Sequence, residues 1–65
     1  MSVAKEIKVY LAKNSITQKW LSMQTGINPE KLSLSLNEKR KLDTEEFSKI
    51  LIALNVPAET FIKTE

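Results

Sequence analysis

Residues 18–37 read QKWLSMQTGINPEKLSLSLN and contain Gly26, the only glycine of the 65-residue chain. A tight turn between two helices needs a residue that tolerates positive φ, and glycine does so without steric cost. The small Ser22 lies where two such helices must approach closely. Three apolar residues have the spacing of side chains that face inward at the crossing: Leu21, Ile27 and Leu32. The stretch therefore predicts a helix-turn-helix, a motif that places its second helix in the DNA major groove.

Helical spacing also dominates the chain on either side of this stretch. Four apolar residues predict a first helix from about residue 3 to residue 14: Val3, Ile7, Tyr10 and Leu11. Thr17 is a good N-cap for a second helix, which ends at about Thr25 with Gly26 as its C-terminal cap. Asn28 followed by Pro29 starts a third helix, which runs to about residue 37.

Two further helices are expected after a basic loop at residues 37–42. Asp43 or Thr44 caps the fourth helix, whose inward stripe has i, i+3, i+4, i+7 spacing: Phe47, Ile50, Leu51 and Leu54. Pro57 opens a last short helix that carries Phe61 and Ile62. Residues 32–36 alternate as Leu-Ser-Leu-Ser-Leu, but a lone strand would have no pairing partner in a helical chain. The sequence therefore predicts one all-α domain over residues 1–65, a compact bundle of four to five helices.

Composition excludes several classes of function. The chain has no cysteine and no histidine, and therefore lacks the residues that form disulfides and most often bind metals or act as general bases. No nucleophile with an adjacent base is visible, and we expect no enzyme activity, no cofactor, no metal and no small-molecule ligand. The longest apolar run, residues 50–54, is far shorter than the roughly 20 residues that cross a bilayer. These features predict a cytoplasmic protein with no membrane association.

Charge is unevenly distributed along the chain. Residues 1–41 hold eight Lys or Arg and three Glu, a balance of +5, whereas residues 42–65 hold two Lys and five Asp or Glu, a balance of −3. Such asymmetry would turn a basic face toward a polyanion such as nucleic acid. The plainer alternative is that these charges form the solvated surface of a small helical protein.

Three sequence motifs give the chain a family resemblance. ITQKWLSxxTGIN begins at Ile16, KLSxxLNxKR begins at Lys31, and FxxILxALNV begins at Phe47. Together they resemble the phage-repressor and Cro-type helix-turn-helix family of bacterial and phage regulators, over roughly residues 4–62. The resemblance implies a lambda-repressor-like all-α fold, in which helices 2 and 3 form the helix-turn-helix and helix 3 enters the major groove.

The resemblance also implies which residues contact DNA. In the family the Gln at the start of helix 2 contacts a phosphate, a role that falls to Gln18 beside the N-cap residue Thr17. The N-terminal half of helix 3 reads base edges, and the corresponding residues here are Asn28, Glu30, Lys31, Ser33 and Leu34. The loop after helix 3 binds backbone phosphates, and the corresponding residues are Asn37, Lys39, Arg40 and Lys41.

Elementary chemistry supports the phosphate contacts more strongly than the base contacts. A helix N-terminus presents unpaired amides and partial positive charge, which suits a phosphate, and the cations at residues 39–41 would release counterions from DNA. For base readout, Glu30 would accept from a cytosine amino group, Lys31 would donate to guanine, and Leu34 would touch a thymine methyl. The structural alternatives are a solvated surface for the polar residues, a favourable interaction with the helix dipole for Glu30, and packing for Leu34.

The chain departs from the family pattern after and within helix 3. Glu38 stands where a glycine often follows Asn37, so that either Glu38 is strained in a left-handed conformation or Asn37 takes that conformation instead. Ser35 stands at a core position, where Leu36 or Leu34 must supply the missing volume. We expect the Ser35 hydroxyl to bond to the carbonyl of residue 31.

A third departure replaces a buried ion pair by two leucines. Members of the family often have an arginine at the position of Leu11 and a glutamate at the position of Leu36, and the two form an ion pair between helices 1 and 3. Apolar replacement of both partners is often neutral or stabilising, because no charge is desolvated. We predict that Leu11 and Leu36 touch in the core.

Two apolar features bear on possible partners. A lone tryptophan on a small domain most often shields the edge of the core, which we expect for Trp20; the alternative is an exposed contact for a partner or for DNA. Residues 56–62, from Val56 to Ile62, carry more apolar surface in Phe61 and Ile62 than so short a helix can bury alone. We therefore expect a homodimer through this segment, with completion of the monomer core as the alternative.

Two functions are consistent with these observations. The first is a sequence-specific, double-stranded DNA-binding transcriptional regulator of bacterial or phage origin that acts as a repressor. The alternative is a protein-interaction module that kept the scaffold and lost base reading, such as an antitoxin or a small phage inhibitor protein. The small number of hydrogen-bond donors on helix 3 supports the alternative.

Overall fold

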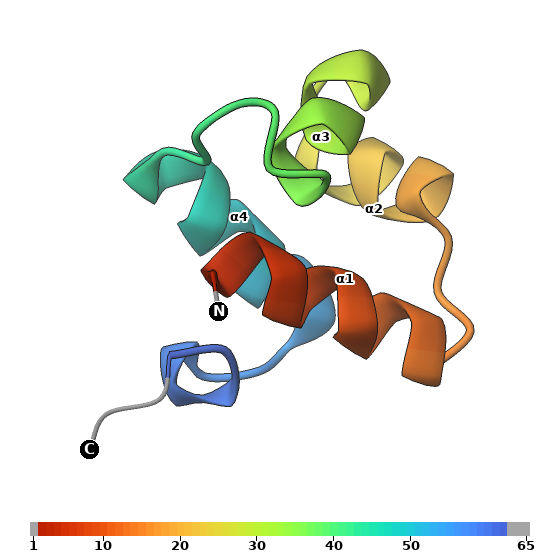
Figure 1. The fold of residues 1–65 in the computed structure, drawn as a ribbon. Helices are drawn as coiled ribbons and strands as arrows, with labels where there is room; N and C mark the ends of the chain where they lie inside the picture. The colour runs from red at the N-terminus through yellow and green to blue at the C-terminus, as the bar shows by residue number, and fades with distance from the viewer. Residues whose placement is uncertain (1, 63–65) are drawn as a thin grey trace.

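The structure, a computed structural model, describes residues 2–62 as a bundle of short helices (Figure 1). The elements are α1 (Val3–Lys13), α2 (Gln18–Thr25), α3 (Pro29–Leu36), α4 (Thr44–Leu54) and a 3-10 turn, η1 (Ala58–Thr60). No strand occurs within residues 2–62, and the alternating leucines and serines of residues 32–36 are helical. The predicted all-α fold class is confirmed. Among the described residues, no helix has both the length and the apolar character that a membrane span requires.

Side-chain caps fix where the helices begin. The Thr17 hydroxyl accepts from the Trp20 amide at 3.0 Å, and the Asn28 side-chain oxygen accepts from the amides of Glu30 and Lys31. Asp43 caps α4 by accepting from the Glu46 amide at 2.7 Å. Each cap satisfies amides that have no carbonyl partner in the first turn of a helix. The predicted starts of α2, α3 and α4 are confirmed, with Asp43 rather than Thr44 as the cap.

The turn between α2 and α3 has the predicted glycine geometry. Gly26 has a φ of 77°, and its amide donates to the Ser22 carbonyl at 2.9 Å. The Ser22 hydroxyl is buried and donates to the carbonyl of Ile27 at 2.6 Å, which ties the end of the turn back to α2. A small hydrogen-bonding residue is therefore required where α2 approaches α3.

One hydrophobic core joins the four helices. α2 packs against both α3 and α4, and α1 packs against α3. The buried apolar residues are Ile7, Leu11, Leu21, Ile27, Leu32, Leu36, Ile50 and Phe61. Leu11 and Leu36 belong to the same core, and direct contact between them stays a prediction. Leu36 is buried, whereas Leu34 is 46% exposed.

The chain after α4 differs from the prediction. The expected last helix is a single 3-10 turn, and both Phe61 and Ile62 follow it. Phe61 is buried and meets the rings of Tyr10 and Phe47 edge to face, with centroids 5.4 Å and 6.4 Å away. Three residues close i to i+3 bonds but are too few to nucleate an α-helix, and aromatic packing holds the segment instead. Phe61 therefore completes the monomer core, and Ile62 remains exposed.

Trp20 lies outside the core rather than at its edge. It is 41% exposed, and Met23, one turn further along α2, is 72% exposed. The buried face of α2 is already occupied by Leu21 and Ser22, and the neighbouring positions of an eight-residue helix must therefore point to solvent. The core-edge expectation for Trp20 is wrong, and a contact of the exposed Trp20 with a partner or with DNA stays a prediction.

The end of α3 places a glutamate in the left-handed region. Glu38 has a φ of 61°, whereas Asn37 has a φ of −96°, so the expectation that Asn37 would relieve the strain is wrong. The Lys39 amide donates to the Leu34 carbonyl at 2.8 Å and the Glu38 amide donates to the Ser35 carbonyl at 3.1 Å. This bond pattern requires the left-handed residue directly after the helix cap, a position that Glu38 occupies.

Candidate nucleic-acid interface

The N-terminus of α2 presents backbone donors to solvent. Thr17 is exposed and Gln18 is half-buried at the start of the helix. The Thr17 side chain satisfies the Trp20 amide, while the amides at the very start of a helix have no carbonyl partner within it. The partial positive charge of the helix end adds to these donors, and the arrangement suits an anionic oxygen.

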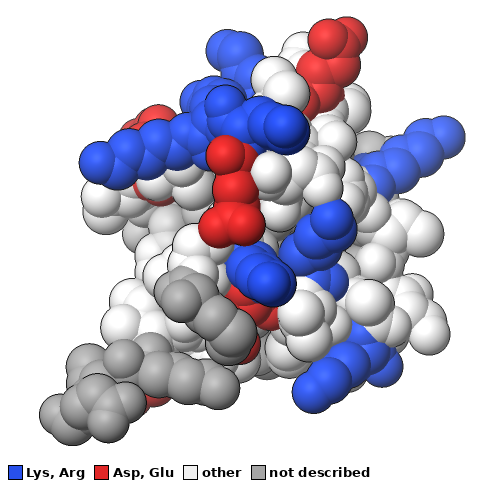
Figure 2. Space-filling model, in the orientation of Figure 1, with Lys and Arg blue, Asp and Glu red and all other residues white. Residues whose placement is uncertain are grey.

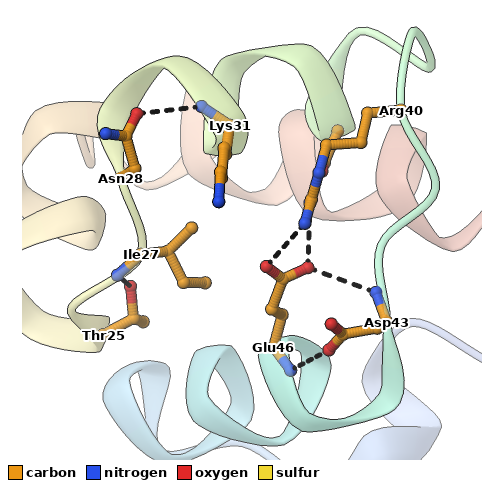
Figure 3. A network of polar contacts seen from close by, with 8 residues as sticks. Thr25, Ile27, Asn28, Lys31, Arg40, Asp43 and Glu46 are labelled. Atoms are coloured by element: carbon orange, nitrogen blue, oxygen red, sulfur yellow. Dashed lines mark hydrogen bonds and ion pairs between the residues drawn. The ribbon is translucent and has the colours of Figure 1, made fainter.

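The outer face of α3 carries few polar side chains. Glu30 and Leu34 are exposed, and Ser33 between them is half-buried. Lys31 is exposed too, but Figure 3 shows its side chain directed toward α4, beside Ile27. The charge of Lys31 contributes to the lowered pKa of the Glu46 carboxyl on α4. The Lys31 side chain is therefore directed toward α4 while its position on α3 remains exposed.

Two asparagines predicted to contact DNA are engaged within the protein. The Asn28 side-chain oxygen accepts from the Glu30 amide at 2.8 Å and from the Lys31 amide at 3.3 Å. The Asn37 side chain accepts from the Lys8 ammonium at 2.6 Å and donates to the Ser33 carbonyl at 2.9 Å. Asn28 thus starts α3, and Asn37 links the end of α3 to α1.

Arg40 is bound inside the loop that was predicted to offer it to phosphate (Figure 3). Its Nη1 donates to Ser35 Oγ at 2.8 Å and to Glu46 Oε1 at 2.9 Å, and its Nη2 donates to Glu46 Oε2 at 3.0 Å. Ser35 is fully buried, and its hydroxyl finds this partner rather than the expected carbonyl of residue 31. Arg40 therefore joins α3 to α4 and is not a free cation of the loop.

Glu46 has two structural roles at once. Its Oε1 accepts from the Asp43 amide at 3.2 Å while its own amide donates to Asp43, which completes a capping box at the start of α4. The hydrogen bond from Arg40 is the main cause that lowers the pKa of the Glu46 carboxyl, against the opposing effect of burial. The same hydrogen bond raises the pKa of Arg40.

The remaining charges do not form an uninterrupted basic stripe. Lys39 and Lys41 are exposed on either side of Arg40, next to the exposed Glu38. Figure 2 shows cationic side chains over the loop between α3 and α4, with carboxylates among them. The predicted basic loop therefore offers fewer free cations than the sequence indicates. Of its three cations, Arg40 is paired with Glu46, and the anionic Glu38 lies next to Lys39.

A helix-turn-helix with an exposed second helix and lysines in the following loop defines a class of DNA-binding domain. Residues 6–65 match the family described as the Cro/C1-type HTH DNA-binding domain. The chain belongs to this family, and the resemblance noted from its motifs is confirmed. Neither the comparison with curated proteins nor the comparison with solved structures gave a significant match.

The roles of Arg40 and Glu46 in holding the loop are not predicted from the sequence. Glu46 is recognisable in the sequence as the acid of an Asp-x-x-Glu capping box. This motif predicts a helix start, but it does not predict the ion pair with Arg40. The exposed Trp20 and Met23, one helical turn apart, were not recognised as an apolar surface of α2. Their i, i+3 spacing on α2 is the signal that indicates a shared apolar surface.

Proposed function

We propose that this Cro/C1-type domain is a sequence-specific, double-stranded DNA-binding transcriptional regulator of bacterial or phage origin that acts as a repressor. The observation that carries the proposal is the glycine-hinged α2–α3 unit, whose second helix is short, capped and exposed along one face. A helix of this kind enters the major groove, where base pairs are distinguishable. Occupation of an operator excludes other proteins from the same DNA, which is sufficient for repression.

The phosphate contacts in this proposal come from two places. The start of α2, at Thr17 and Gln18, offers backbone donors and the positive end of the helix dipole. The loop after α3 offers Lys39 and Lys41, while Arg40 and Asn37 hold the loop in place through their bonds to neighbouring helices. Lysines that neutralise phosphates release counterions, and binding then weakens as salt rises.

A homodimer on a two-fold symmetric operator remains part of the proposal. One module of this size contacts few base pairs, and two half-sites one helical turn apart raise both affinity and specificity. In residues 56–62 the burial of Phe61 leaves Ile62 as the exposed large apolar residue. The dimer surface would therefore centre on Ile62. Sedimentation equilibrium at micromolar concentration tests it: Ile62→Asp should lower the association constant, and a monomer at all concentrations would contradict it.

The test of DNA binding is the salt dependence of affinity. The affinity of the full chain for duplex DNA should fall steeply with salt, and the double variant Lys39→Ala, Lys41→Ala should reduce the slope of log affinity against log salt by about two. Fluorescence anisotropy with a labelled duplex at four or more salt concentrations measures both quantities.

A matched control separates local contacts from total charge. Lys49→Glu on α4 changes the net charge by the same two units as the double variant, yet lies on an exposed position outside the helix-turn-helix. It should change the salt slope much less. An equal loss in both variants would show that binding follows net charge alone, and salt-independent binding would contradict the phosphate contacts.

A second function is favoured by one observation on α2. Trp20 and Met23 expose an apolar surface on the helix-turn-helix, and aromatic residues with methionine are enriched in protein interfaces. An interaction module, such as an antitoxin or a small phage inhibitor protein, would use such a surface. Trp20→Ala would then abolish partner binding and leave DNA affinity unchanged, because the regulator uses the start of α2 at Thr17 and Gln18, the α3 face and the loop.

A further inference from the structure

We propose that the cavity between the start of α1 and the loop after α3 binds a small organic phosphate monoester, and that this ligand competes with DNA for Lys39 and Lys41. The binding goes beyond the proposed function, whereas the competition rests on it. The sequence predicts no small-molecule ligand, but the residues that line this cavity are distant in the chain and form no local pattern.

The cavity is large enough for a ligand bigger than a single ion. Its volume is about 510 Å³, and pockets that hold small molecules measure roughly 300–1,000 Å³. It is lined by residues 2–4 at the start of α1, by residues 38–42 of the loop, and by Ser35 of α3. Figure 1 shows the start of α1 next to this loop. An inorganic phosphate would leave most of the space empty, so we expect a phosphate that carries an organic body.

Cations outnumber anions among the side chains that line the cavity. The charged residues there are Glu38, Lys39, Arg40 and Lys41. Lys39 and Lys41 are exposed, and within residues 2–62 neither side chain has a hydrogen bond or an ion pair with another residue. A phosphate monoester carries a charge of about −1.5 to −2 at pH 7. Two free ammonium groups therefore suit a monoester, because each binds phosphate as a point charge.

Arg40 contributes hydrogen-bond donors although its charge is paired with Glu46. A guanidinium group has five N–H donors. Three of them bond to Ser35 and Glu46, which leaves two without an acceptor among residues 2–62. The Arg40 side chain is 30% exposed and lines the cavity. The two remaining donors therefore suit phosphate oxygens, with which guanidinium forms strong, charge-assisted bonds.

The organic body has an apolar surface to pack against. Val3, Ala4 and Leu42 line the same cavity and are partly buried. An aromatic or aliphatic group placed against them would be removed from water, which is favourable. The cavity thus combines a cationic part for a phosphate with an apolar part for the group that carries it.

Competition with DNA follows from the lysines of the cavity. Lys39 and Lys41 are the residues that the proposed function assigns to DNA phosphates. A ligand bound to them neutralises the charge that would release counterions from DNA. DNA affinity should therefore fall as the ligand concentration rises, and DNA should lower the affinity for the ligand by the same factor.

The binding test uses phenyl phosphate as the probe and the full chain without DNA. An NMR titration of the backbone amides should give saturable shifts concentrated at residues 2–4 and 38–42. Phenyl phosphate should bind at least about tenfold more tightly than inorganic phosphate, which lacks the ring. Phenol, which lacks the phosphate, should not bind. Equal affinities for phenyl phosphate and inorganic phosphate, or shifts located elsewhere, would overturn the site.

Two substitutions in the cavity should have opposite effects. Lys41→Ala should weaken phenyl phosphate binding about tenfold, because a charge-assisted contact is lost. Glu38→Gln should strengthen it roughly threefold, because the carboxylate that repels a phosphate becomes a neutral amide. Circular dichroism checks that each variant is folded.

Matched controls separate the cavity from the total charge of the protein. Lys49→Ala on α4 and Glu59→Gln in η1 make the same changes in net charge at exposed positions outside the cavity. Both should leave the affinity for phenyl phosphate within about twofold, because salt screens distant exposed charges. Equal effects of the cavity variants and their controls would show attraction to net charge alone and would overturn the site.

A diester probe distinguishes a free monoester from the backbone of DNA. Methyl phenyl phosphate keeps the ring but carries a single charge, as each phosphate of DNA does. It should bind more weakly than phenyl phosphate, because the second charge of the monoester is missing. Equal or tighter binding of the diester would overturn the monoester assignment.

Fluorescence anisotropy of a labelled duplex tests the competition, with the ionic strength held constant by KCl. Saturating phenyl phosphate should lower the DNA affinity of the unmodified protein about fivefold or more, and should not change that of the double variant Lys39→Ala, Lys41→Ala. An unchanged DNA affinity of the unmodified protein would overturn the competition. A chain that binds phenyl phosphate in the cavity but binds no DNA would support the site and overturn the proposed function.

Discussion

Individual residues at the helix ends carry much of the conformational strain. Four described residues have positive φ, and only one of them is glycine: Ser15, Gly26, Glu38 and Asn55. A left-handed conformation costs an ordinary L-residue roughly 1–2 kcal/mol, and asparagine tolerates it better than glutamate does. Gly26 avoids this cost at the hinge of the helix-turn-helix, whereas Glu38 bears it in the loop beside the lysines.

Opposite substitutions at these two positions should have opposite effects on stability. At Gly26 an added Cβ would meet no heavy atom within 4 Å, so that Gly26→Ala suffers only the backbone penalty, a net loss of about 1 kcal/mol after the smaller entropy of the unfolded chain is counted. Glu38→Gly should relieve the same strain and gain up to about 1 kcal/mol. Urea unfolding measures both, and a loss from Glu38→Gly would contradict the assignment of strain to its φ.

At the scale of elements, helix starts are well specified and the connection between α3 and α4 is specified by one ion pair. The caps of α2, α3 and α4 each use a side chain one position before the helix. The loop before α4 relies on Arg40, whose partner Glu46 is six positions away on the first turn of that helix. The side chains of Arg40 and Glu46 are 30% and 15% exposed, so that solvent screens the pair only in part.

The ion pair makes stability depend on acidic pH. Because the folded pKa of Glu46 is below its ordinary value of 4.5, the stabilisation is fully present above that value and is lost as the pH falls through the folded pKa. Glu46→Gln should lower the Tm at pH 7 by on the order of 5 °C, the shift for a small domain that loses about 1 kcal/mol. Thermal unfolding from pH 7 to pH 3 should show the two proteins converging at low pH; a constant difference would exclude the carboxylate as the cause.

At the scale of the whole molecule, a thin core makes each buried residue important. A domain of about 60 residues buries only about 60% of its unfolded surface, and within residues 2–62 the core contains eight buried apolar residues. Leu11 and Leu36 occupy the interior between α1 and α3, where the family often has an ion pair. Their burial replaces two desolvated charges by hydrocarbon.

Leu11→Ala should destabilise the fold by about 2–5 kcal/mol through the cavity it leaves. Such a loss could unfold a domain this small, so the volume-conserving Leu11→Met provides a second measurement, with an expected cost below about 1.5 kcal/mol. Urea unfolding monitored by circular dichroism gives both values. Ile52→Ala at an exposed site should stay within about 0.5 kcal/mol, and a loss there equal to that of Leu11→Ala would show that burial does not govern the effect.

Local patterns predict the elements better than they predict the site. The starts of α2, α3 and α4 follow from capping residues beside apolar stripes, and these signals lie within one turn of the boundary they specify. The path of the loop depends on the left-handed Glu38, and that path brings Arg40 to Glu46 and Ser35. The burial of Phe61 similarly depends on rings from α1 and α4. Contacts that depend on the path of a loop, or that join residues far apart in the sequence, leave no periodic signal.

Because Glu46 closes the capping box and also holds Arg40, the first turn of α4 cannot fray without releasing the lysine-bearing loop. The loop and that turn therefore open as one cooperative unit, and their backbone amides share one free energy of local unfolding. A half-buried carboxylate on α4 thus sets how long two surface lysines, to which it makes no bond, keep their positions.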